Sequence, residues 1–203
     1  MGLGHRIQAG VAMLTFNEDL HQYQFNGVVK PSVTQVLSRL HSFGMVPKDV
    51  LEAACQRGSY VHTLCEYHDQ NDLDSESIGI YGGYLDAWIQ FCADHKAVWT
   101  SIEQRGYSER YGFAGTWDRA GTLKGIQHVV DIKTSVAPHP VWGLQTAAYR
   151  QLMAEADTSW LLARRATVQL RPDGSYKLIT WDSPDDWTAF ISLINLTNWS
   201  NKS

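Results

Sequence analysis

The stretch Gly112–Tyr149 decides the fold, and at its centre lies the sequence VVDIKT, residues 129–134. β-Branched residues lead there into an acid, an apolar residue and a base, a pattern typical of a short buried strand. Since side chains alternate across a strand, Asp131 and Lys133 share one face while Ile132 points into a core. An acid and a base at the end of a hydrophobic strand are costly to bury unless they pair, bind a metal or take part in chemistry.

A second strand is predicted just upstream, over residues 111–118 (YGFAGTWD), and it ends at Asp118 after a flexible Gly-Thr pair. The glycines would let backbone or a ligand approach closely. If Asp118 and Asp131 converge from neighbouring strands, their carboxylates form a site for a hard divalent cation such as magnesium. Lys133 would then be a fixed positive charge beside that site. The pattern indicates either a metal centre or a structural ion pair.

A helix is predicted over residues 141–155, and it places Gln145 and Tyr149, four residues apart, on one face. The ordered set of Gly-Thr-Trp-Asp, Asp-Ile-Lys-Thr and Gln-Thr-Ala-Ala-Tyr resembles the PD-(D/E)XK nuclease superfamily, in particular its RecB-like branch and the phage exonucleases. The resemblance implies an α/β fold with a restriction-endonuclease-like mixed central sheet flanked by helices. It also implies hydrolysis of phosphodiester bonds in DNA with Mg²⁺ or Mn²⁺ as cofactor.

The resemblance further assigns roles to individual residues. Those with catalytic roles are Asp118, Asp131, Lys133, Gln145 and Tyr149. The implied metal ligands are His62, Asp118, Asp131 and the backbone carbonyl of Ile132. Contacts to DNA are expected from Arg57, Arg119, Gln145 and Tyr149. For the Gln-x-x-x-Tyr pair, the alternative is a buried tyrosine bonded to a glutamine.

His62 lies in the sequence RGSYVH, residues 57–62, on a helix predicted from Pro47 to about His68. The buried stripe of this helix is expected to comprise Val50, Ala54, Val61 and Cys65. In the RecB-like pattern this histidine completes the metal sphere, while a structural histidine is the alternative. Glu66, one turn further along the same face, is another possible ligand or a solvent-facing acid. Glu103, on a strand predicted over residues 98–107, is either a ligand or the partner of a salt bridge to Arg105.

The N-terminal region extends the resemblance to nearly the whole chain. Segments 11–16 and 21–29 predict a hairpin, and Pro31-Ser32-Val33-Thr34 predicts a helix to about Leu40 that is capped by Ser32. This order of elements resembles the N-terminal region of the phage exonucleases. Residues 1–10 carry no pattern and are expected to form a loose tail. Further elements are predicted as a helix over 81–95, a hairpin of segments 159–170 and 175–181, and a helix over 185–198. A single domain over residues 1–203 is expected.

The composition is that of an ordinary globular protein, with 44% hydrophobic and 19% charged residues, and it excludes a disordered chain or a coiled coil. No apolar run is long enough to cross a bilayer, so no membrane partner is expected. The cysteines Cys55, Cys65 and Cys92 show no metal-binding spacing and are expected to be reduced core thiols. They favour a cytoplasmic protein, and the resemblance implies a bacterial or phage-infected cell.

The net charge of −4 counts against tight DNA binding, because phosphate contacts supply much of that affinity. A small acidic protein lacks an obvious basic surface for an uninterrupted duplex, which favours an enzyme that needs a DNA end. Together with this argument, the resemblance to the phage exonucleases implies an exonuclease in recombination, repair or phage DNA processing. A single-strand annealing or recombination protein is a possible partner. A structure-selective endonuclease and a non-catalytic DNA- or protein-binding module on the same scaffold are the alternatives.

Overall fold

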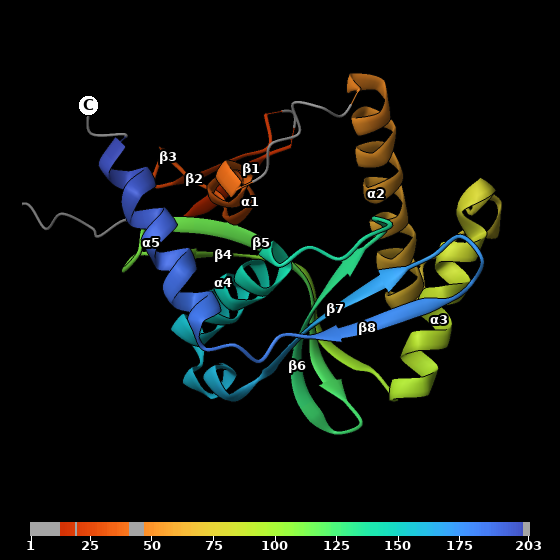
Figure 1. Cartoon of the computed structure of the whole chain (residues 1–203). Coiled ribbons are helices and arrows are strands. Elements are labelled where there is room, and N and C mark those ends of the chain that lie inside the picture. Colours follow the sequence, from red (N-terminus) through yellow and green to blue (C-terminus); the bar gives the residue numbers. More distant parts are fainter. Residues whose placement is uncertain (1–12, 19, 41–46, 201–203) are drawn as a thin grey trace, which may run out of the picture.

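The computed structural model describes residues 13–18, 20–40 and 47–200. It contains a small three-stranded sheet and a larger five-stranded sheet with helices on both faces (Figure 1). The loose tail predicted for residues 1–10 lies outside the described residues.

The larger sheet has the strand order β4-β5-β6-β7-β8. Its strands are β4 Val98–Ser108, β5 Phe113–Leu123, β6 Ile126–Lys133, β7 Arg164–Leu170 and β8 Tyr176–Thr180. Only the β6–β7 pair is parallel within this sheet, and the other neighbours are antiparallel. The parallel pair is joined through helix α4, as a crossover between parallel strands requires. The predicted mixed central sheet flanked by helices is thereby confirmed.

Helices cover the two faces of this sheet. On one face lie α2 Lys48–Asp69 and α3 Gly82–His95, and on the other lie α4 Val141–Ala156 and α5 Asp185–Ser200 (Figure 1). Each face has its own apolar core, with Trp88 fully buried in the first and Phe190 in the second. Short 3₁₀ turns complete the chain at Ser38–Leu40, Ser75–Ser77, Gly79–Tyr81 and Thr158–Leu162.

Strand β6 shows why the charged pair lies on one side of the sheet. Val129 belongs to the core beneath α4, while Val130 and Ile132 belong to the core beneath α2 and α3. The alternation predicted from the sequence therefore places Asp131 and Lys133 on the same side as Val129. They lie at the C-terminal end of the strand, where the apolar core ends.

The small sheet consists of β1 Leu14–Asn17, β2 Gln22–Phe25 and β3 Val28–Lys30, all antiparallel. It corresponds to the predicted hairpin with its second turn at Asn26-Gly27. The Phe25 ring stacks on Tyr107 of β4, with centroids 4.1 Å apart. The small sheet is thus attached to the edge of the larger one.

Helix α1, Val33–Leu37, follows directly and begins at Ser32 as predicted. Ser32 and Gln35 form a capping box, in which each side chain accepts from the other's backbone N–H. Just before it, Pro31 accepts a hydrogen bond of 3.0 Å from the backbone N–H of Ala114. This contact joins the N-terminal segment to β5 close to the predicted site.

Three details of the sequence interpretation are wrong. Val50 and Ala54 were expected in the buried stripe of α2, but Val50 is 54% exposed and Ala54 is only half-buried. The N-terminal turns of α2 extend beyond the sheet (Figure 1), so the sheet offers them no surface to pack against. The segment expected to be strand from Ser159 is a 3₁₀ turn up to Leu162. Cys55 is exposed rather than part of the core.

No helix in the described part of the chain is long and apolar enough to cross a membrane.

Candidate active site

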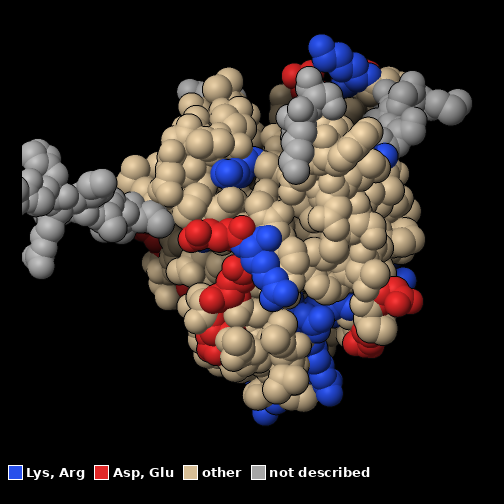
Figure 2. Space-filling model, turned by 90° about the vertical axis from the view of Figure 1, so that its left-hand side faces the viewer, with Lys and Arg blue, Asp and Glu red and all other residues tan. Residues whose placement is uncertain are grey.

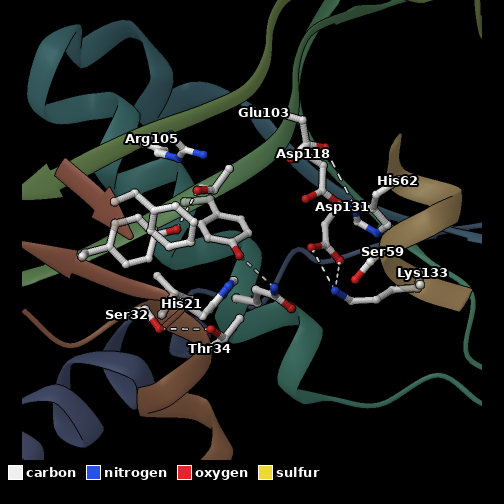
Figure 3. A pocket seen from close by; sticks show the side chains of 18 residues that line it. His21, Ser32, Thr34, Ser59, His62, Glu103, Arg105, Asp118, Asp131 and Lys133 are labelled. Atoms are coloured by element: carbon white, nitrogen blue, oxygen red, sulfur yellow. Dashed lines mark hydrogen bonds and ion pairs between the residues drawn. The ribbon is translucent and has the colours of Figure 1, made fainter. Parts of the chain in front are cut away.

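A cleft of about 380 Å³ lies between the small sheet, helix α2 and the ends of strands β5 and β6. Its lining includes His62, Glu103, Asp118, Asp131 and Lys133 on one side (Figure 3). These residues come from α2, β4, β5 and β6, so the fold brings together side chains that are up to 71 positions apart in sequence. The cleft is therefore the place where the predicted motifs meet.

Three of these residues form a compact group of possible metal ligands. Each of His62, Glu103 and Asp118 offers one ligand atom, and these three atoms lie within 4.8 Å of one another. His62 Nδ1 is 3.6 Å from Asp118 Oδ2 and 3.8 Å from Glu103 Oε1. One imidazole nitrogen and two carboxylates form a donor set that suits a divalent cation.

The orientation of His62 follows from its second ring nitrogen. Nε2 lies 3.0 Å from the carbonyl oxygen of Ile132, and because a carbonyl can only accept, Nε2 must carry the proton and donate. Nδ1 then faces the two carboxylates, as expected for a metal ligand whose other nitrogen is fixed by a hydrogen bond. The Ile132 carbonyl orients the histidine, and its predicted role as a metal ligand stays a prediction.

Asp118 is held by the backbone of the neighbouring strand. Its Oδ2 accepts a hydrogen bond of 2.6 Å from the N–H of Ile132. Burial raises the pKa of Asp118, while the nearby His62 acts in the opposite direction. For His62 itself, burial lowers the pKa, but the carboxylates of Asp118 and Glu103 outweigh it and raise the pKa to about 9. The group thus binds a proton where a cation would otherwise balance the carboxylates.

Glu103 was left open by the sequence, and the structure places its carboxylate in the site. It does not pair with Arg105, as the alternative supposed. Arg119 Nη1 donates to Glu103 Oε1 at 3.0 Å and to the Asp118 carbonyl at 2.7 Å, while Arg119 Nε donates to Asp69 at 2.7 Å. Glu103 also has a φ of +47°, a strained backbone for a residue with a side chain.

Asp131 forms a pair with Lys133 rather than a part of the three-residue group. Lys133 Nζ lies 2.8 and 3.1 Å from the two oxygens of Asp131, which is 1% exposed. Burial raises the pKa of Asp131 to about 6, and Lys133 opposes the shift. For Lys133, burial lowers the pKa, but Asp131 and Asp118 outweigh it, so the lysine stays charged. Figure 3 shows Asp131 between Asp118 and Lys133.

Gln145 and Tyr149 line the same cleft from α4, as the helical spacing predicted. Gln145 Nε2 donates to the Tyr149 hydroxyl at 2.9 Å, so the bond foreseen as the structural alternative exists within the cleft. Burial, followed by the Asp131 and Asp118 charges, raises the pKa of Tyr149 well above its ordinary value. The phenol therefore stays protonated and can donate into the cleft.

The structure separates the remaining predicted residues from the site. Arg119 is 0% exposed, so the predicted DNA contact is wrong. This side chain instead bridges Glu103 of the site and the buried Asp69. Glu66 accepts a hydrogen bond from Gln70 and is neither in the ligand group nor in the cleft lining. Arg57 does not line the cleft, and its buried Nε has no hydrogen-bond partner among the described residues. A DNA contact from Arg57 stays a prediction.

Two tryptophans close to the predicted motifs, Trp117 and Trp142, are core residues. Trp117 and Trp142 are 7% and 6% exposed, and the Trp117 indole N–H donates to Ser101 at 2.6 Å. Sequence reasoning also missed Asp69, which anchors Arg119 from the end of α2. It has no motif around it, because its role depends on a partner that is 50 positions away. The side chains that the small sheet contributes to the cleft lining were missed for the same reason.

Comparison with known proteins gives only distant similarities. No protein-family model matches the sequence, and no curated protein is significantly similar to it. The solved structure of a protein named SSO0001 aligns at a TM-score of 0.44 and 17% identity, over 85% of this chain and 76% of that one. A candidate exonuclease from Eubacterium rectale aligns at a TM-score of 0.47 and 9% identity, over 69% of this chain and 64% of that one. Neither similarity is high enough to assign a function.

Proposed function

We propose that the protein is a metal-dependent deoxyribonuclease that acts as an exonuclease at DNA ends. The observation that carries the proposal is the convergence of His62, Glu103 and Asp118 beside the Asp131–Lys133 pair in one cleft. The order of the motifs and their resemblance to the PD-(D/E)XK nucleases support the same reading.

The residues of the cleft fit a divalent cation. Buried carboxylates without a cation are costly, and here they raise the pKa of His62 to about 9. Asp131 Oδ2 is buried and lies 2.8 Å from Lys133 Nζ, but it accepts no hydrogen bond of regular geometry from the described residues. His62, Glu103 and Asp118 would hold Mg²⁺ or Mn²⁺, with Asp131 at its side. When bound, such a cation makes a coordinated water more acidic and offsets negative charge on a phosphate.

The protein supplies the remaining chemistry through side chains with fixed protonation. Lys133, kept charged by Asp131, would orient the attacking water and offset the negative charge that develops on the phosphate. The protonated Tyr149, placed by Gln145, would donate a hydrogen bond to a phosphate oxygen. Arg119 holds Glu103 and Asp69 in position from within the core.

Action at an end is favoured by the size of the cleft and by the surface charge. A cleft of about 380 Å³ has the dimensions of a small-molecule site and can accommodate a nucleotide rather than an intact duplex. On the face seen in Figure 2, basic and acidic side chains lie next to one another, and most of the surface carries neither. With a net charge of −4, the grip on the substrate is expected to come from the cleft.

The test compares end-labelled linear DNA with the same molecule as a covalently closed circle, each with Mg²⁺ or Mn²⁺ and with a chelator. Wild-type protein should shorten the linear form only with metal and leave the circle intact. Asp131→Asn, which removes charge at nearly constant shape, should abolish shortening while the far-UV circular dichroism spectrum stays that of the wild type. Nicking of the circle would reject the exonuclease in favour of an endonuclease. Absence of any cleavage would leave a non-catalytic binding module as the better account.

A further inference from the structure

The wall of the cleft opposite the metal-ligand group is built from aromatic and cationic side chains. Phe16 and Tyr23 of the small sheet, His21 from the turn between their strands, and Arg105 of β4 all line the cleft. Figure 3 shows His21 and Arg105 across the opening from His62. The functional motifs of the sequence do not include this wall.

The side chains of His21, Tyr23 and Arg105 all contact the Phe16 ring. The Phe16 ring centroid lies 5.1 Å from that of His21, in an edge-on arrangement, and 4.6 Å from that of Tyr23. The guanidinium of Arg105 lies 4.5 Å from the Phe16 centroid. Tyr23 is buried, Phe16 is half-buried, and His21 and Arg105 are exposed. The wall thus has a fixed apolar base and an exposed rim.

This wall is fixed to the strand that carries the metal-ligand group. The Tyr23 hydroxyl is hydrogen-bonded at 2.6 Å to Thr116 Oγ1, and Thr116 lies two residues before Asp118 on β5. The Phe25–Tyr107 stack holds the same small sheet on β4. The distance between the aromatic wall and the reacting centre is therefore set by the fold, as a preformed subsite requires.

Arg105 is available to a ligand. Its contact with an acid is Glu18 at 3.5 Å, and the two side chains are 44% and 82% exposed. A salt bridge so exposed to water contributes little, so exchange of Glu18 for a phosphate group is easy. An aromatic surface beside an arginine is the combination that binds unpaired nucleotides, since bases stack on rings and the guanidinium pairs with phosphate.

We propose that Phe16, His21 and Arg105 form a subsite for the unpaired terminal nucleotide of a single DNA strand, with the base stacked on the exposed His21 ring, which the Phe16 ring supports edge-on. The subsite rests on the proposed nuclease function and names its substrate class. A base can stack there only when it has left its duplex, so the enzyme prefers single strands or frayed ends. A nucleotide seated on this wall places its phosphate toward Lys133 and Asp118 across the cleft.

The experiment measures KM and kcat for a single-stranded oligodeoxynucleotide and for the same oligomer with abasic terminal residues. The variants are Phe16→Leu, which keeps an apolar side chain, His21→Ala, and the control Trp199→Ala, an exposed aromatic on α5 that is 69% exposed. A lost base stack of about 1–3 kcal/mol corresponds to a rise in KM of about 5- to 150-fold. We expect this rise for Phe16→Leu and His21→Ala on the normal strand, with kcat within about twofold, and no change for the control.

On the abasic oligomer, the wild type should already have the raised KM, and the two variants should add nothing further. Full additivity of the mutation and the abasic ends would overturn the subsite, as would an unchanged KM or a loss confined to kcat. Melting temperatures within about 2 °C of wild type separate these effects from unfolding.

Failure of the subsite proposal can be distinguished from failure of the nuclease proposal. If wild-type protein cleaves no DNA, fluorescence anisotropy of the labelled oligomers in chelator gives Kd values for the same variants and strands. The same pattern in Kd would retain the subsite without catalysis, and equal Kd values across all variants and both oligomers would refute it. Tighter binding of a blunt duplex than of the single strand would also refute it.

Discussion

Removal of the Arg119 side chain is the perturbation whose effect follows most directly from the structure. Arg119 is 0% exposed and donates to Asp69 at 2.7 Å and to Glu103 at 3.0 Å. The Asp69 side chain is itself only 3% exposed, and Trp88 Nε1 also donates to it. In Arg119→Ala both carboxylates lose the guanidinium, and the buried Asp69 keeps only its contacts with Trp88 and with His68 Nδ1 at 3.1 Å.

Leaving one partner of a buried ion pair unpaired costs about 3–5 kcal/mol. For a chain of this length, each kcal/mol lowers the melting temperature by about 2–4 °C, so a fall of about 6–20 °C is expected. Urea denaturation followed by far-UV circular dichroism measures the free energy of unfolding. Arg164→Ala, which removes an exposed arginine from β7, is the matched control and should change it by less than about 0.5 kcal/mol.

A second substitution tests the reason for the loss. In Arg119→Ala combined with Asp69→Asn the uncompensated charge is gone, so part of the stability should return and the two effects should not add. A loss below about 1 kcal/mol in Arg119→Ala, or simple additivity in the double variant, would refute the buried network as described.

Three further predictions concern the cleft. In metal-free protein the pKa of His62 is about 9, against an ordinary 6.5. Protonation of His62 therefore stabilises the folded state by at most about 3 kcal/mol. This contribution is complete below about pH 6.5 and is lost as the pH rises through 9. The difference in unfolding free energy between wild type and His62→Asn should therefore shrink over that range, and a constant difference would contradict it. Lys133→Met should lower kcat for DNA cleavage on the order of 10²-fold, and unchanged kcat would remove the lysine from the chemistry. In Gly115→Ala the new Cβ would lie 2.9 Å from Val33 Cγ2 and 3.1 Å from Tyr149 Cε1, so urea denaturation should show a loss of about 1–3 kcal/mol; wild-type stability would show that the helices can move apart.

Local patterns in the sequence were sufficient for most of the fold. The alternation in β6 placed Asp131 and Lys133 on one face, and Ser32 as a cap fixed the start of α1. Helical spacing placed Gln145 beside Tyr149. Each of these features depends on neighbours within a few residues, which is the range over which strand and helix periodicity acts.

The site itself was only partly predictable, because its partners come from distant segments. Glu103 could not be distinguished from a salt-bridge partner of Arg105 until β4 and β5 were paired and Arg119 was seen between Glu103 and Asp69. An arginine on a central strand looks the same in sequence whether it contacts solvent or bridges two buried acids.

The aromatic wall illustrates the same limit. Phe16 and His21 belong to a hairpin whose pattern predicts strands and turns, and nothing local indicates that β4 brings Arg105 over the Phe16 ring. Its relation to the metal-ligand group depends on the contact between Tyr23 and Thr116. Which residues share a cleft is a property of how the two sheets pack.

The central claim is that DNA cleavage depends on a metal held by His62, Glu103 and Asp118. Its most direct test is the initial rate of shortening of an end-labelled linear strand, measured across a titration of Mn²⁺ for wild type and Glu103→Gln. The wild type should be inactive without metal and saturate with it, while Glu103→Gln, which keeps the shape but loses a ligand charge, should need at least about tenfold more Mn²⁺ for half-maximal rate. Equal half-maximal Mn²⁺ concentrations for the two proteins, or wild-type cleavage that persists in chelator, would contradict the claim.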